Sequence, residues 1–128
     1  MARSAPVVTA GGEAVVGFVD MWERKPVLVG RAGASLEVSG WAACTAPGCS
    51  VERVVVLIDG QAFGEVRSFF SRPDVARAYG RPEFGSSGWR TTIWLRGLRP
   101  GWYSLSAMGT GSNGKSAVLP AFQLVVVE

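Results

Sequence analysis

Short apolar runs rich in Val, Ile, Trp and Phe recur along the sequence, and Gly, Pro, Asn and Asp separate them at intervals. Runs of this length and composition are typical of β-strands, and their spacing is typical of a sandwich or a barrel. The predicted strands lie at about residues 14–20, 26–30, 34–43, 51–59, 62–69, 88–96, 102–109 and 116–127. The pattern therefore predicts an all-β fold.

Two stretches between these runs carry local structural signals. IDGQ, at residues 58–61, contains Asp-Gly, the strongest short hairpin signal, so the strands on either side should be antiparallel neighbours. SRPDVARAYG predicts one helical turn, because Pro73 suits the first helical position, Asp74 favours the positive N-terminus and Gly80 can end the turn. Helix capping accounts for the residue types in this stretch, so Asp74 and Arg72 are given no catalytic role.

GTGSNG, at residues 109–114, has the glycine spacing of a dinucleotide-binding turn. Such a turn needs a helix that starts on the glycines and a second parallel strand about thirty residues later. Only KSAVLPAFQLVVVE follows here, and it contains Pro120 and ends in a β-branched, strand-like run. GTGSNG is therefore interpreted as a hairpin loop whose glycines supply positive φ angles, and a nucleotide site is rejected.

The length of 128 residues suits one domain that buries roughly two-thirds of the surface of its unfolded chain. We expect a flexible segment at 1–12 and a single domain at 13–128, made of an N-terminal extension (13–30) and a core (34–128). No apolar run approaches the roughly 20 residues of a membrane-spanning helix. The first residues also lack a secretory apolar region, so either the chain is cytoplasmic or a targeting segment lies outside this sequence.

The charged residues argue against catalysis and nucleic-acid binding. The net charge is +3, and the basic residues, mostly arginine, are spread from Arg3 to Arg99 without forming a cluster. Histidine is absent, which excludes Ser-His-Asp and Cys-His catalysis and histidine-ligated metals. The acidic residues form no recognisable pair. We therefore predict no catalytic residue, no cofactor, no metal site and no nucleic-acid partner.

The two cysteines, Cys44 and Cys49, enclose the sequence TAPG. Because the Pro-Gly turn can bring them within disulfide distance, we predict a disulfide that closes this loop, which would imply an oxidising compartment. Two free thiols are the alternative.

From about Ala34 onward, the chain resembles the immunoglobulin-like β-sandwich modules of bacterial cell-surface and glycan-processing proteins. The resemblance is carried by LEVSGWAA, VERVVVLIDGQAFG, RPDVARAYG, SSGW and LRPGWYSLSAMGTGSNG. The pattern L-x-P-G-x-Y-x-L is also similar to the penultimate strand of fibronectin type III domains. The resemblance implies that Tyr103 faces inward and helps to form the sandwich corner, and that the module is non-catalytic and extracytoplasmic. Many relatives place an acidic residue after this strand, which can bind calcium, but Gly111 stands there in this chain.

Period-2 alternation, combined with that topology, predicts which side chains point outward. Trp41 should point outward from 34–43, and Arg90, Trp94 and Arg96 from 88–96, on neighbouring strands. Trp41 and Trp94 would then stand together beside two arginines, where they could stack on sugar rings or anchor a protein. The alternative is that the N-terminal extension covers them.

Alternation also predicts apolar side chains on the outer face of the second sheet. If Val54, Val56 and Ile58 point inward, Val55 and Leu57 point outward. On the last strand Phe122, Leu124 and Val126 would point inward, and Val125 and Val127 outward. Trp102 and Met108 would join the outer face. Strands that are apolar on both sides indicate that both faces are covered.

The sequence thus predicts an immunoglobulin-like antiparallel β-sandwich. Its predicted role is a non-enzymatic binding or assembly module of the periplasm or cell surface, docking on a larger envelope-associated protein through an outer sheet face. A carbohydrate-binding module using the exposed tryptophans is the alternative.

Overall fold

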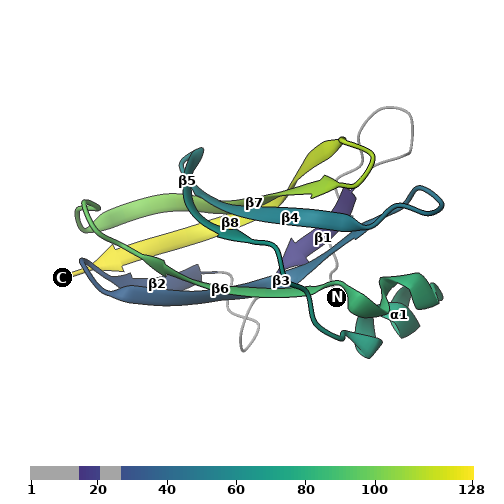
Figure 1. The fold of residues 1–128 in the computed structure, drawn as a ribbon. Coiled ribbons are helices and arrows are strands. Elements are labelled where there is room, and N and C mark those ends of the chain that lie inside the picture. Colours follow the sequence, from purple (N-terminus) through teal and green to yellow (C-terminus); the bar gives the residue numbers. More distant parts are fainter. Residues whose placement is uncertain (1–14, 21–26) are drawn as a thin grey trace.

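The computed structural model describes residues 15–20 and 27–128, which form two facing β-sheets and a short helical segment (Figure 1). The strands are β1 (Val15–Val19), β2 (Val27–Arg31), β3 (Ser35–Cys44), β4 (Val51–Ile58), β5 (Gln61–Val66), β6 (Gly88–Trp94), β7 (Gly101–Gly111) and β8 (Ser116–Val127). The helical segment between β5 and β6 consists of α1 (Pro73–Tyr79) and the 3-10 helix η2 (Pro82–Ser86). Each predicted strand is present, with ends displaced by a few residues, and the all-β prediction is confirmed. The helix η2 was not predicted.

The strand order is that of an immunoglobulin-like sandwich. One sheet has the order β1-β3-β6 and the other β2-β8-β7-β4-β5, which correspond to the A-B-E and G-F-C arrangements of these folds. β2 runs parallel to β8, whereas the other strand pairs are antiparallel. The predicted N-terminal extension therefore supplies one edge strand to each sheet. The predicted flexible segment, 1–12, lies outside the described residues.

The core lies between the two sheets and is formed by alternate residues of each strand. The fully buried side chains are Val15, Val38, Val54, Val56, Ile58, Trp89, Ile93, Leu95, Leu105, Leu119, Leu124 and Val126. The predicted inward residues of β4 are among them, as are Leu124 and Val126 of β8. The side chain of Phe122 lies outside the described residues. Each buried aliphatic side chain contributes roughly 1.5–3 kcal/mol to folding, so alternation largely determines which faces meet.

A register shift in the β7–β8 pair changes which β8 residues face inward. The shift falls between Leu105 and Ala107 on β7. Leu119 and Leu124, separated by an odd number of residues, are consequently both buried, whereas Val118 is exposed. A β-bulge of this kind cannot be read from simple alternation.

The β4–β5 hairpin forms as the Asp-Gly signal predicts. Asp59 and Gly60 have φ angles of 49° and 83°, the positive values that a tight two-residue hairpin turn requires. The Asp59 carboxylate also accepts a hydrogen bond from the Ser104 backbone N–H at 2.8 Å. The hairpin is thereby held against the neighbouring strand β7.

GTGSNG connects the antiparallel strands β7 and β8, so its interpretation as a hairpin is confirmed. The reason for its glycines differs from the prediction, because only Gly114 has a positive φ, 83°. A Cβ on Gly109 would lie 2.7 Å from Cγ1 of Val15, and one on Gly111 would lie 2.9 Å from Sγ of Cys49. Close packing therefore requires these two glycines.

Candidate binding surfaces on the outer sheet faces

Trp41 is covered, and the prediction that it stands exposed beside Trp94 was wrong. Its exposed fraction is 5%, and it clusters with Val16, Ala43, Val75 and Phe84. Its ring centroid lies 5.1 Å from that of Tyr79 and 6.2 Å from that of Phe84. Trp41 does leave the core side of β3, as alternation predicts, but α1 and η2 fold over it. Among the described residues of the extension foreseen as cover, Val16 belongs to this cluster, and it lies within the same sheet.

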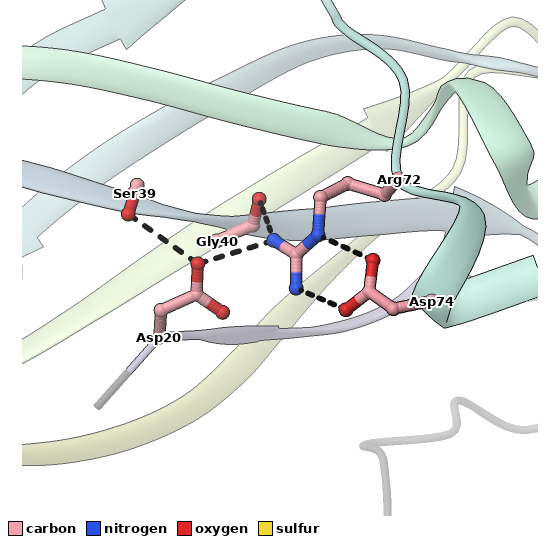
Figure 2. Close-up of polar contacts among 5 residues, drawn as sticks. All are labelled: Asp20, Ser39, Gly40, Arg72 and Asp74. Atoms are coloured by element: carbon pink, nitrogen blue, oxygen red, sulfur yellow. Dashed lines mark hydrogen bonds and ion pairs between the residues drawn. The ribbon is translucent and has the colours of Figure 1, made fainter. Parts of the chain in front are cut away.

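Arg72 attaches the helical segment to the sheet (Figure 2). Its guanidinium donates two hydrogen bonds of 3.0 Å to the Asp74 carboxylate. Its Nη1 donates to Oδ2 of Asp20 at 3.1 Å and to the Gly40 carbonyl at 3.3 Å. The Ser39 hydroxyl donates to the same Asp20 oxygen at 3.3 Å. The end of β1, the middle of β3 and the start of α1 are thus joined through one side chain, which we call the Arg72 clamp.

The charges of the clamp stabilise each other. The hydrogen bonds from Arg72 lower the pKa of Asp74, and the hydrogen bonds to Asp74 raise the pKa of Arg72. The Arg72 side chain is only 19% exposed, whereas that of Asp74 is 59% exposed. The sheltered contacts of Arg72 with Asp20 and Gly40 should therefore contribute most of the stabilisation that the clamp provides.

Trp94 lies at the other end of the β3–β6 ladder. It is 54% exposed, and it pairs with Ser35, whereas Trp41 pairs with Gly88. The seven residues from Gly88 to Trp94 are separated by six steps, which span about 20 Å of strand. The two tryptophans therefore cannot contact one ligand ring together.

Two arginines do lie outward on this part of the sheet, as predicted. The Arg96 guanidinium carbon lies 5.2 Å from the Trp94 ring centroid. The Arg90 guanidinium lies 5.4 Å from the Phe70 ring centroid and 3.7 Å from the Glu37 carboxylate. Arg90 thus has an acidic partner. Within the described part of the chain, no carboxylate pairs with Arg96.

The outer face of the five-stranded sheet is apolar over much of its area. Trp102 is 64% exposed and Val29 is 61% exposed, and both lie beside Val125 in adjacent strands. Further along the sheet, Met108 lies between Val55 and Val118. The half-buried or exposed apolar residues of this face include Val29, Val55, Leu57, Trp102, Met108, Val118, Val125 and Val127. We call this set the five-strand patch. The predicted outward residues Val55, Leu57, Trp102 and Met108 all belong to it.

Polar residues separate the two ends of the five-strand patch. Ser104 and Gln123 face each other there, with Ser106 beside them. The helical segment packs on the other sheet, against Trp41, and lies at one end of the sandwich (Figure 1). Among the residues that the structure describes, no element lies over the five-strand patch.

The predicted disulfide is present between Cys44 and Cys49, whose Cα atoms are 5.6 Å apart. It closes the β3–β4 loop and lies against Gly111 at the end of β7. A cavity of about 60 Å³ beside it is lined by both cysteines, Glu83 and Ser87. Ligand pockets usually enclose about 300–1,000 Å³, so this space suits a few water molecules rather than a sugar or a nucleotide.

Within residues 15–20 and 27–128, no group of three or more His, Cys, Asp or Glu side chains could hold a metal ion. No helix in those ranges is long and apolar enough to cross a membrane.

Tyr103 supports the type of sandwich that the sequence resembles. It packs against the core at the start of β7, and its hydroxyl donates a hydrogen bond of 2.6 Å to the Arg99 carbonyl. A tyrosine bonded to the backbone a few residues upstream is the tyrosine corner of these folds.

Comparison with known proteins agrees with this assignment. The fold matches a solved structure of fibronectin(III)-like modules of CbhA from Clostridium thermocellum, with a TM-score of 0.55. The chain has a fibronectin(III)-like fold. The match has 14% sequence identity and covers 86% of this chain and 46% of that one, so the chain spans about half of the matched structure. No protein-family model and no curated protein sequence matches the chain described here.

Proposed function

We propose that this chain is a non-catalytic module that docks onto a larger, envelope-associated protein through the five-strand patch. The single observation that carries the proposal is the exposure of Trp102 and Val29 on either side of Val125 on one sheet face. Contiguous apolar surface of this kind marks interaction sites in soluble proteins. Tryptophan is also the residue type most enriched at the energetic centres of interfaces.

The layout of the patch suits a protein partner better than a small ligand. The patch has two apolar ends with Ser104, Ser106 and Gln123 between them, which resembles the mixture of apolar and hydrogen-bonding groups in protein interfaces. It lies on a sheet face and not in a closed pocket. Trp102, the most exposed large apolar side chain of the described residues, is the expected anchor.

Two further observations support a module in a larger, extracytoplasmic assembly. The Cys44–Cys49 disulfide is typical of oxidising compartments. The matched structure contains fibronectin(III)-like modules and is about twice the length aligned here. Accordingly, the partner is a neighbouring domain or a larger protein of the periplasm or cell surface.

Site-specific photocrosslinking in intact cells tests the docking surface. A photoreactive phenylalanine analogue would replace Trp102 in one variant and Tyr79 in the control variant. Tyr79 is also exposed but lies on α1, at the other sheet. The expected result is a covalent adduct with one defined protein from position 102 only. Adducts of equal yield from both positions, or none from position 102, would contradict the proposal.

Carbohydrate binding is the second candidate function, and the exposure of Trp94 is the observation that favours it. The proposed platform now contains Trp94 with Arg90 and Arg96, because Trp41 is buried against Phe84. Binding of soluble polysaccharides to the whole chain, compared with Trp94→Ala, tests this function.

A further inference from the structure

The surface around Trp94 is a narrow, open strip. β1 pairs with β3 only from Val19–Gly40 to Val15–Cys44. The rows Ser35–Trp94 and Glu37–Thr92 therefore belong to a part of the sheet that has two strands among the described residues. An exposed indole on such a strip offers an apolar ring face to a flat ligand. The C–H face of a sugar ring meets this requirement.

Arg96 gives this strip an unbalanced positive charge. Its guanidinium lies 5.2 Å from the Trp94 ring centroid. Arg67, Arg72, Arg81 and Arg90 each pair with an Asp or Glu. In the described ranges no carboxylate pairs with Arg96, as is also the case for Arg53, Arg77 and Arg99, but only Arg96 lies over an exposed tryptophan ring. A guanidinium is the side chain best suited to bind a carboxylate through two parallel hydrogen bonds. The ligand of this strip should therefore carry a negative charge.

The surroundings favour a hydroxyl-rich ligand with at most one charge on each sugar over a more densely charged polymer such as a polysulfate. Ser35 lies opposite Trp94, and Thr92 lies two residues before it on the same side of β6, so two hydroxyl-bearing residues neighbour Trp94 on this face. The charge of Arg90 is already balanced by Glu37, at 3.7 Å. Only the Arg96 guanidinium therefore remains to neutralise ligand charge in this strip, which suits one carboxylate better than closely spaced phosphates or sulfates.

We propose that this strip binds an acidic polysaccharide whose sugars carry carboxylates. One sugar ring stacks on the face of Trp94 opposite Arg96, and a carboxylate of a neighbouring sugar binds the Arg96 guanidinium. Hydroxyls of Ser35 and Thr92 bond to the sugar hydroxyls. The inference rests on the second proposed function and specifies its ligand, while the five-strand patch lies on the opposite face of the sandwich and is left free.

The test uses the whole chain and a panel of polyuronates, namely polygalacturonate, alginate and hyaluronate. Each polymer is paired with its carboxyl-reduced counterpart, which keeps the linkages but removes the charge. Affinity is measured by isothermal titration and by retardation in polymer-containing gels. At least one polyuronate should bind, and its reduced form should bind at least tenfold more weakly. Arg96→Gln should lower the affinity for the polyuronate to that of the reduced polymer, and Trp94→Ala should abolish binding of both.

Trp102→Ala is the matched control, because it removes an equally exposed tryptophan from the other sheet and should leave polyuronate binding unchanged. Thermal melting confirms that each variant is folded. Equal binding of charged and reduced polymers would overturn the inference while carbohydrate binding stands. Absence of binding to every polymer would overturn both. Equal affinity for dextran sulfate or single-stranded DNA would show general polyanion binding and would also overturn the inference.

Discussion

Replacing Arg72 by alanine should loosen the helical segment from the sheet and destabilise the whole domain. The two bonds to Asp74 involve an exposed carboxylate, and such surface pairs contribute about 0–1 kcal/mol. The bonds to Asp20 and to the Gly40 carbonyl are more sheltered, and hydrogen bonds to charged groups contribute about 1.5–3 kcal/mol. We therefore expect Arg72→Ala to lower the free energy of unfolding by about 2–3 kcal/mol, since these contributions overlap.

Urea denaturation gives the free energy of unfolding, and thermal melting should show a decrease of about 6–12 °C for a domain of this size. Acrylamide quenching reports whether Trp41 becomes accessible, since α1 and η2 cover it. Asp74→Ala should reproduce only the minor part of the loss, and Asp20→Ala the major part. The reasoning is refuted if Arg72→Ala changes stability by less than about 0.5 kcal/mol, the range of ordinary surface substitutions. It is equally refuted if Asp74→Ala is as damaging as Arg72→Ala.

Three other perturbations have definite expected outcomes. Trp41→Ala should cost about 3–5 kcal/mol in urea denaturation because it empties a buried aromatic cluster, whereas Trp94→Ala should cost less than about 1 kcal/mol; similar losses would contradict the assigned burial. The double variant Cys44→Ser/Cys49→Ser should lose about 2 kcal/mol, the chain-entropy value for so short a loop, and a reductant should have the same effect on the wild type but none on the variant. The pKa of Asp74 is lowered from 3.8 in the folded state, so its stabilising contribution is present above that pH and disappears as the pH falls through the lowered value. Asp74→Asn should therefore flatten the acid limb of the stability curve below about pH 4, and an unchanged limb would contradict this.

Much of the fold was predictable, because the position of a strand and the direction of its side chains depend on local turn signals and on the alternation of apolar residues. The Asp-Gly turn at 59–60 demands a hairpin whatever surrounds it, and β-branched alternation in β4 determines which of its residues face the core. The helical turn at 73–79 followed from Pro73 and from Gly80, whose φ of 62° ends the helix. Each of these signals depends on only a few neighbouring residues, so it can be read from the sequence without knowledge of tertiary contacts.

The candidate surfaces were only partly predictable, because the burial of an outward-pointing side chain depends on contacts between segments that are distant in the sequence. Alternation places Trp41 on the outer side of β3 correctly but cannot show that Tyr79 and Phe84 fold onto it. A signal was present, since a short surface helix followed by Arg-Pro-Glu-Phe contains more aromatic surface than a solvated turn needs. The contact of Arg72 with Asp20 joins residues 52 positions apart, and nothing in either local sequence indicates it.

The helical segment explains why the two outer faces differ. It covers one end of the three-stranded sheet and is held there by the Arg72 clamp, while the end near Trp94 remains open. Trp94 and Trp102 lie at the same end of the sandwich, joined by the β6–β7 loop, but they project from the opposite outer faces of two sheets that pack about 10 Å apart. A polysaccharide bound at Trp94, as proposed above, would therefore leave Trp102 accessible to the proposed protein partner. Binding measurements made with both ligands present should then show independent affinities, and competition between them would place both on a single surface.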